Sequence, residues 1–131
     1  LRVLLEVLLL ANSKLDGATL RRADLRNAGM CEVSLRGADL TEAMLSGADL
    51  GNAVLESATL YGADLSASNL GGAKLSNADL RNANLSGSNL HSVELDGAQL
   101  GGATVDGATV LETQREFLKD QGVSIDRVNW A

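Results

Sequence analysis

The sequence predicts an all-β solenoid, a chain that turns a corner once every five residues around one narrow apolar core. The first observation is a period: every position divisible by five from Leu5 to Val110 is Leu, Met or Val, and 19 of these 22 positions are Leu. The second is a companion register two residues earlier, in which 15 positions are Ala. The third is composition, because the 131 residues include no Pro and only one Phe, one Tyr and one Trp. The core is therefore built from repeated small and medium side chains.

A period of five is incompatible with both regular secondary structures. Five residues rotate an α-helix by about 500°, so successive Leu side chains would lie ~140° apart and cover every face. In a straight strand the side chains alternate, so an odd repeat would send successive Leu to opposite faces. If the chain instead turns a corner in each repeat, the Leu and the Ala two residues before it both point inward. The other three residues then face water.

The residues at the expected corners support this interpretation. The second residue after each Leu is Gly or Asn in 14 of the 21 repeats from Val7 to Gly107. Gly and Asn tolerate the positive φ that the third position of a type II turn requires. The absence of Pro also agrees, because each short side must donate its N–H groups to a neighbouring coil.

The repeated segment has the form A(D/N)LXX, as in Ala23-Asp24-Leu25, Ala63-Asp64-Leu65 and Ala78-Asp79-Leu80. From about residue 13 to residue 110 the sequence resembles the pentapeptide-repeat family, which is abundant in bacteria and particularly in cyanobacteria. The resemblance implies a right-handed quadrilateral β-helix in which four pentapeptides, or 20 residues, make one coil. It implies about five coils here, with inner ladders of Leu that include Leu20, Leu25, Leu40, Leu50, Leu65, Leu80 and Leu90.

We divide the chain into an N-terminal cap or first partial coil (1–12), a β-helix (13–112) and a C-terminal capping helix with a tail (113–131). Residues 1–10 are nearly all apolar, but they are too few to span a membrane, and Arg2 and Glu6 interrupt them. Two alternatives stay open for this segment. It continues the five-residue register, or it forms a short helix that covers the first coil; a third role is contact with another chain or domain. Because the chain lacks an initiator Met, we expect a processed product or an excised fragment.

At the other end, Thr113 and Glu116 are spaced as the N-cap and N3 residues of a capping box, and Phe117 and Leu118 follow them. Gly122 is suited to the position just after a helix. We therefore predict a helix over about 114–121, whose apolar side covers the last coil.

The 20-residue coil allows candidate catalytic groups to be tested by position. Residues 20 apart stack at ~4.8 Å. Cys31 and His91 share one outward column but lie three coils apart, too far for a nucleophile and its base. We expect each Asp that precedes a Leu to accept hydrogen bonds from nearby backbone, and the column Asp49, Asn69, Asn89 and Thr109 to form a ladder of side chains. We predict no catalytic, cofactor or metal site, and a protein that is not an enzyme.

The net charge of −6 is unevenly distributed. Residues 11–36 hold five bases and three acids, whereas residues 37–110 hold two bases and nine acids. This balance argues against direct nucleic-acid binding. It makes the basic residues of the first coils a candidate interaction surface: Arg21, Arg22, Arg26 and Arg36.

The function that we predict is a non-enzymatic structural or protein-interaction module with an unidentified protein partner, present as a monomer or an end-to-end dimer. The alternative is a DNA-mimicking inhibitor of DNA gyrase, a role that the resemblance implies for some relatives, which confer fluoroquinolone resistance. Against it stand the basic first coil, the absence of an insertion that breaks the repeat, and the absence of Phe from the Leu positions. We expect no membrane span. We favour the cytoplasm as the compartment over the thylakoid lumen or the periplasm.

Overall fold

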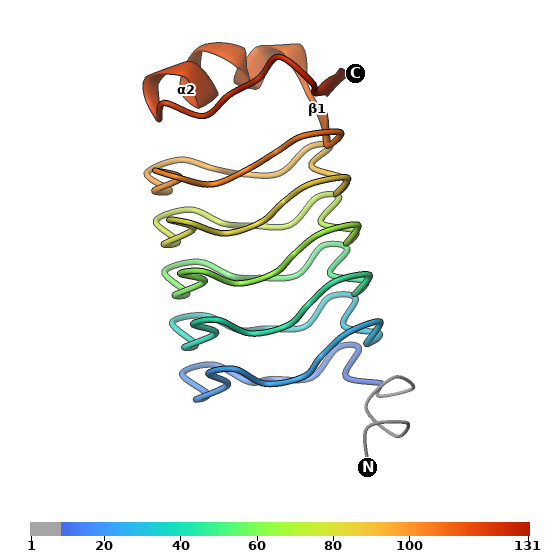
Figure 1. The fold of residues 1–131 in the computed structure, drawn as a ribbon. Coiled ribbons are helices and arrows are strands. Elements are labelled where there is room, and N and C mark those ends of the chain that lie inside the picture. Colours follow the sequence, from blue (N-terminus) through green and yellow to red (C-terminus); the bar gives the residue numbers. More distant parts are fainter. Residues whose placement is uncertain (1–8) are drawn as a thin grey trace.

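Residues 9–131 are described by a computed structural model, in which the chain forms a rod of stacked coils with a helix across its C-terminal end (Figure 1). Parallel bridges join residues that lie 20 apart, from Leu9–Gly29 through to Asn89–Thr109. Residues 9–108 therefore form five coils of four short walls each. We name the walls after their first inward residues: the Leu10, Leu15, Leu20 and Leu25 walls. Each wall has only one rung of the ladder, because the chain turns again after about three extended residues.

The corners have the predicted conformation. Every second residue after the inward position, from Asn12 to Gly107, has a positive φ. The N–H group of the next residue donates to the carbonyl of the inward residue three positions earlier, at N···O distances of 2.9–3.3 Å. This is the hydrogen bond and the φ pattern of a type II turn. Arg22 and Glu42 also adopt positive φ at their corners, so the stacking of the coils overrides the local preference of the side chain.

The core is the column of inward side chains. The inward residues from Leu25 to Val110 and the small residues beside them are buried, and they form one continuous cluster. Of the Leu side chains named above, all but one are at most 4% exposed. The exception is Leu20, which is half-buried in the first coil together with Leu10 and Leu15. Leu9 is 81% exposed and continues the register outward. The two alternatives for the N-terminal segment otherwise lie outside the described residues.

Two Ser residues are buried in the core without an unsatisfied hydroxyl group. Ser68 and Ser88 replace the usual Ala. Their Oγ atoms donate to the carbonyl oxygens of Leu65 and Leu85 at 2.6 and 2.7 Å. Each hydroxyl therefore shares the carbonyl that already accepts the N–H group of the turn, and the core stays dry at little cost.

The C-terminal cap is a coil in which helix replaces two walls. Strand β1 (Thr109–Val110) leads into the 3-10 helix η1 (Glu112–Gln114) and the helix α2 (Arg115–Asp120), and β2 (Asn129–Trp130) then pairs with β1 in parallel. Thr109 faces Asn129, again 20 residues away. The tail thus resumes the pentapeptide register, with inward positions at Val123, Ile125, Val128 and Trp130, all of which pack on the core.

Helix α2 ends in a Schellman motif. Gly122 has a φ of +72°, and its N–H group donates to the Lys119 carbonyl at 2.8 Å. The N–H group of Val123 donates to the Leu118 carbonyl at 3.1 Å. The side chains of Leu118 and Val123 are both buried, which is the apolar contact that accompanies this motif. Gly122 thereby turns the chain from the helix back onto the last coil.

A matched pair of Gly substitutions tests how neighbouring coils fit at the corners. A Cβ atom added at Gly72 would lie 2.3 Å from Oδ1 of Asn52 in the coil before it, whereas a Cβ at Gly37 would meet no atom within 4 Å. Both glycines have positive φ, so both substitutions by Ala carry a backbone cost of ~1 kcal/mol. We expect Gly72→Ala to be the more destabilising of the two in urea denaturation, because it also displaces Asn52. Equal losses of unfolding free energy would show that the Asn52 amide does not pack over Gly72.

Candidate functional site

Cys31 and His91 are separated as predicted, and neither has a catalytic partner within residues 9–131. They lie 60 residues apart on the Leu10 wall. Burial raises the pKa of the half-buried Cys31 thiol, and the carboxylates of Asp49 and Glu32 raise it further, so the reactive thiolate is disfavoured. His91 is exposed, and its Nδ1 lies 3.0 Å from the hydroxyl of Ser92. Among residues 9–131 there is also no group of three His, Cys, Asp or Glu side chains that could hold a metal ion.

The Asp residues that precede Leu bind local backbone, as predicted. Oδ1 of Asp49 accepts from the N–H group of Gly51 at 3.1 Å, and that of Asp64 accepts from Ser66 at 3.0 Å. The same arrangement recurs at Asp39 and Asp79. These bonds fix the carboxylates against the walls.

The predicted ladder is present for three of its four residues. Nδ2 of Asn69 donates to Oδ1 of Asp49, and Nδ2 of Asn89 donates to Oδ1 of Asn69, both at 3.0 Å. Thr109 has no side-chain hydrogen bond to Asn89 in this structure. The outward amides of the Leu10 wall are therefore tied to one another and not free to rearrange around a ligand.

Two of the four arginines proposed as an interaction surface pair with acids one coil away. Nε of Arg22 lies 2.5 Å from Oε2 of Glu42, on the Leu20 wall. Arg36 forms an ion pair with Glu56 on the Leu15 wall. Both pairs are 20 residues apart, so each acid stacks directly on its base.

The other two arginines also pair with carboxylates. Arg21 lies 3.2 Å from Asp39, and the Arg26 guanidinium binds both carboxylate oxygens of Asp24 at 2.7 and 2.8 Å. Hydrogen bonds from Thr41, and then from Arg21, hold the pKa of Asp39 below its usual range. The structure thus distributes the four arginines over three walls and neutralises each of them locally. It does not bring them together as one basic patch.

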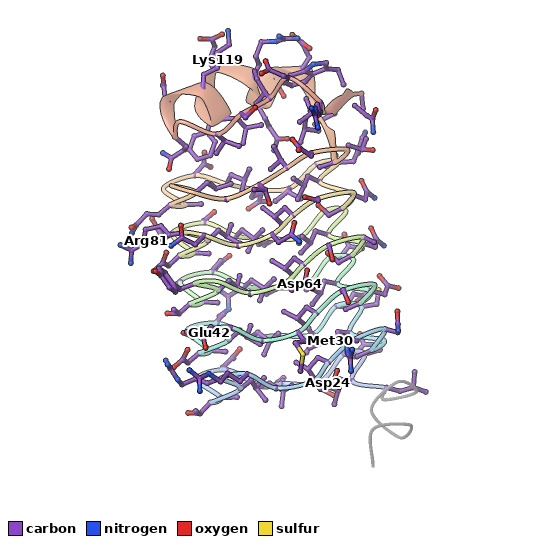
Figure 2. The ribbon with its side chains drawn as sticks, in the orientation of Figure 1. Asp24, Met30, Glu42, Asp64, Arg81 and Lys119 are labelled. Carbon is purple, nitrogen blue, oxygen red and sulfur yellow. The ribbon has the colours of Figure 1, made fainter. Side chains whose placement is uncertain are left out.

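A further cluster on the Leu20 wall was not singled out from the sequence. Arg81 projects from the rod (Figure 2), binds both carboxylate oxygens of Asp79 at 2.7 and 2.8 Å, and lies over the ring of Tyr61 at 5.7 Å. Hydrogen bonds from Arg81 lower the pKa of Asp79. The hydroxyl of Tyr61, which is 40% exposed, accepts from Nδ2 of Asn82 at 2.9 Å. The signal was the column that places Tyr61 20 residues before Arg81.

The capping contacts differ from the predicted capping box. Thr113 lies within η1, and the residue before α2 is Gln114, whose side chain makes no cap hydrogen bond to that helix. Glu116 is in the first turn of α2 and pairs with Lys119 at 3.4 Å. The capping box of Thr113 and Glu116 is therefore wrong, because the 3-10 turn starts the helical segment two residues earlier than the sequence pattern suggested. Of the other two residues named for the cap, Leu118 is buried on the core and Phe117 is half-buried beside it.

Two Gln side chains connect the helical cap to the last full coil. Nε2 of Gln114 donates to the carbonyl of Val93 at 2.9 Å, and Oε1 of Gln121 accepts from the N–H group of Leu100 at 3.0 Å. In the lower coils these backbone groups bond to the backbone of the next coil, as when Leu80 N–H donates to the Gln99 carbonyl. The Gln amides therefore substitute for the backbone of the walls that η1 and α2 replace.

This assignment predicts unequal effects of two substitutions in the cap. We expect Gln121→Ala to lower the free energy of unfolding by about 1–2 kcal/mol, because it leaves the N–H group of Leu100 without its acceptor. Thr113→Ala is expected to change it by less than about 0.5 kcal/mol, because Thr113 is exposed. Urea denaturation followed by circular dichroism measures both. A larger loss for Thr113→Ala than for Gln121→Ala would contradict the assignment.

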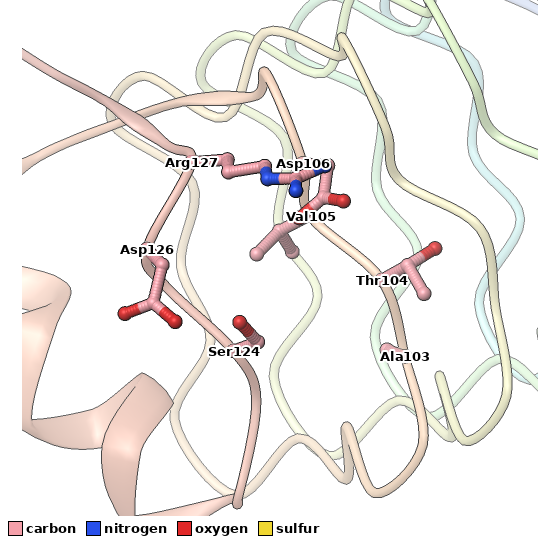
Figure 3. Close-up of a pocket in the computed structure, with 7 residues that line it drawn as sticks. All are labelled: Ala103, Thr104, Val105, Asp106, Ser124, Asp126 and Arg127. Atoms are coloured by element: carbon pink, nitrogen blue, oxygen red, sulfur yellow. The ribbon is translucent and has the colours of Figure 1, made fainter.

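Two shallow pockets lie beside the cap. In the first, Ser124, Asp126 and Arg127 of the tail lie on one side and residues 103–106 on the other (Figure 3). Here the tail separates from the Leu25 wall: Arg127 still bonds to the last coil, through the N–H group of Gly107 at 2.7 Å, but no bridge joins Thr104 to Ser124. The second pocket lies between residues 93–96 of the Leu15 wall and residues 113, 114 and 117 of the cap.

The helices within residues 9–131 include none long and apolar enough to cross a membrane. A search of curated proteins found no match. Among solved structures, a pentapeptide repeat protein from the thylakoid lumen of Arabidopsis thaliana is 30% identical, with a TM-score of 0.60 over 85% of this chain and 74% of that one. Rfr23, a pentapeptide repeat protein from the cyanobacterium Cyanothece 51142, is 25% identical, with a TM-score of 0.52 over 71% of this chain and 88% of that one.

A sequence profile of pentapeptide repeats matches eight copies, over residues 9–30, 34–72 and 68–107. These segments cover most of the chain and coincide with the stacked coils described above. Structures of this family are right-handed β-helices, in agreement with the fold that the resemblance implied. The chain belongs to the pentapeptide repeat family.

Proposed function

We propose that the chain is a non-enzymatic protein-interaction module, a rigid rod that presents fixed side chains on flat walls to a protein partner. The observation that carries this proposal is the completely filled interior: the inward Leu residues from Leu35 to Leu85 are at most 1% exposed. A rod with no internal cavity between these residues has only its outer walls and its ends to offer a ligand. Specific recognition of a folded partner requires such preorganised surface groups.

The outer walls are held rigid by interactions between coils. The amide ladder on the Leu10 wall and the ion pairs on the Leu15 and Leu20 walls each link side chains of adjacent coils. Tyr61 and Arg81, residue types enriched in binding hot spots, are exposed on the Leu20 wall and are already ordered by Asp79 and Asn82. The Leu20 wall is therefore the wall that we expect a partner to contact first.

The four arginines of the first coils contribute to such a surface as paired charges on three walls. Inhibition of gyrase as a DNA mimic is not the function that we propose. A mimic of a duplex needs a continuous negative surface, whereas Arg21, Arg22, Arg26 and Arg36 interrupt it. The cytoplasm remains our preferred compartment. The similarity to a lumenal plant protein supports the thylakoid lumen as the next choice.

The experiment that tests the proposal is affinity capture from the native source with a panel of wall variants. One variant removes the exposed cluster on the Leu20 wall, through Tyr61→Ser and Arg81→Ser. Its control changes the Leu25 wall at Ser66→Ala and Ser86→Ala, where the side chains are small and half-buried. We expect one partner to be captured by the wild type and by the control and to be lost with the Leu20-wall variant. Capture of nothing, or equal capture by both variants, would contradict the proposal.

A further inference from the structure

The Leu15 wall ends in two backbone donors that have no partner in the described part of the chain. In the coil below, Leu75 N–H donates to the Glu94 carbonyl at 2.8 Å and Asn77 N–H donates to the Asp96 carbonyl at 2.9 Å. The equivalent donors one coil higher are the N–H groups of Leu95 and Gly97, and no hydrogen bond to them is present within residues 9–131. The wall that would accept from them is replaced by η1 and α2. The last Leu15 wall is therefore a free edge of the β-helix.

This free edge lines the second pocket. Val93 and Leu95, at most 7% exposed, form its floor, and the half-buried Phe117 of α2 lies on the opposite side. The outward side chains of Glu94 and Asp96 are exposed at its rim, and no basic residue lines it. The pocket thus combines unpaired N–H groups, an apolar interior and a negative rim.

The register of the lower coils shows how an added strand would fit. A strand stacked on this wall would place two carbonyls, separated by one residue, over the N–H groups of Leu95 and Gly97. The residue between those carbonyls points inward, between Leu95 and Phe117. The two residues that carry the carbonyls point outward and stack ~4.8 Å above Glu94 and Asp96.

The same columns show which side chains suit the outward positions. Lys74 is the bridge partner of Glu94 in the coil below. In the column that ends at Asp96, Arg36 lies between Asp16 and Glu56; it pairs with Glu56, and its backbone N–H donates to Asp16 at 2.9 Å. Opposite charges in neighbouring strands stabilise pairing. Basic residues on both sides of one apolar residue would therefore match the edge.

We infer that the crevice between residues 93–97 and helix α2 binds an extended peptide segment of a partner protein, with a basic–apolar–basic sequence, by strand addition. This inference rests on the proposed function and names the chemistry of a partner for it. The partner supplies two carbonyls to the backbone, one apolar side chain to the interior and two cations to the rim.

The test is a titration of the full-length ¹⁵N-labelled protein with the peptide acetyl-Gly-Ala-Lys-Leu-Arg-Gly-Asn-amide, followed by nuclear magnetic resonance. We expect the amide signals of Leu95 and Gly97 to shift, and those of Leu75 and Asn77, which already have acceptors, to stay in place. The double variant Glu94→Gln/Asp96→Asn should weaken binding about fivefold. The matched control Glu32→Gln/Asp49→Asn changes the net charge equally on the Leu10 wall and should leave the affinity within about twofold.

A peptide with Glu in place of its Lys and Arg should not bind. The inference is overturned if the first peptide fails to bind at millimolar concentration, if the shifts map away from Leu95 and Gly97, or if the control variant weakens binding as much as the rim variant. If the peptide fails but a partner is still lost with the Leu20-wall variant, only the crevice is wrong. Failure in both experiments would contradict the proposed function as well.

Discussion

One alanine inserted between Ala63 and Asp64 is expected to lower the free energy of unfolding by more than about 5 kcal/mol, a large part of the total stability of a domain. An extra residue turns every later Leu to the wrong side of the wall until the chain absorbs it in a bulge. Any such bulge disrupts the bridges that Asp64 makes with Met44 and Asn84. Urea denaturation and the sites of limited proteolysis measure the effect.

The control for this insertion is deletion of residues 51–70, which removes one whole coil. All remaining residues keep their columns, because the bridges join residues 20 apart. We expect the shortened chain to fold and to lose stability in a graded manner, as nearest-neighbour interactions in a solenoid predict. If the inserted residue were tolerated as well as this deletion, the five-residue register would not be what holds the coils together.

Leu65→Ala is expected to lower the free energy of unfolding by about 2–5 kcal/mol. Leu65 is fully buried, and it stacks in one inner column between Leu45 and Leu85. Truncation leaves a cavity that the neighbouring coils cannot close without breaking their hydrogen bonds. Leu20→Ala, in the half-buried first coil, should cost less, since the side chain already contacts water. Denaturation followed by circular dichroism compares the two, and a neutral Leu65→Ala would contradict the inward position of this column.

The coils were predictable because their cause is local and repeated. A Leu every five residues with Ala two positions earlier leaves only one way to bury both, and Gly or Asn at the corners supplies the positive φ. The acid–base pairs follow from the same arithmetic once the coil length is known. Arg22 and Glu42, for example, lie 20 residues apart and meet at 2.5 Å. Net charge alone suggested a basic surface, because it ignores which charges stack on one another.

The cap was less predictable because its contacts are tertiary. The Thr113–Glu116 spacing resembles a capping box, yet Gln114 and Gln121 make the important bonds, to backbone groups of Val93 and Leu100. No local pattern indicates those partners. The tail did carry a signal: Val128-Asn129-Trp130 repeats the Ala-Asn-Leu pattern in the correct register, with a Trp at the inward position. Arg115 lies over that Trp130 ring at 4.1 Å, which accommodates the larger side chain at the open end.

The most direct test of the 20-residue coil uses the only cysteine of the chain. Sγ of Cys31 lies 3.8 Å from the position of a Cβ atom added at Gly51, one coil above it. Adjacent coils are ~4.8 Å apart, within the Cα separation that a disulfide permits, whereas Gly71 lies two coils from Cys31 at ~10 Å. Gly51→Cys should therefore lose both free thiols on mild oxidation of dilute protein and remain monomeric by the thiol count and by non-reducing electrophoresis. Gly71→Cys should keep both thiols, and a cross-link that forms as readily at position 71 as at position 51 would contradict the stacking described here.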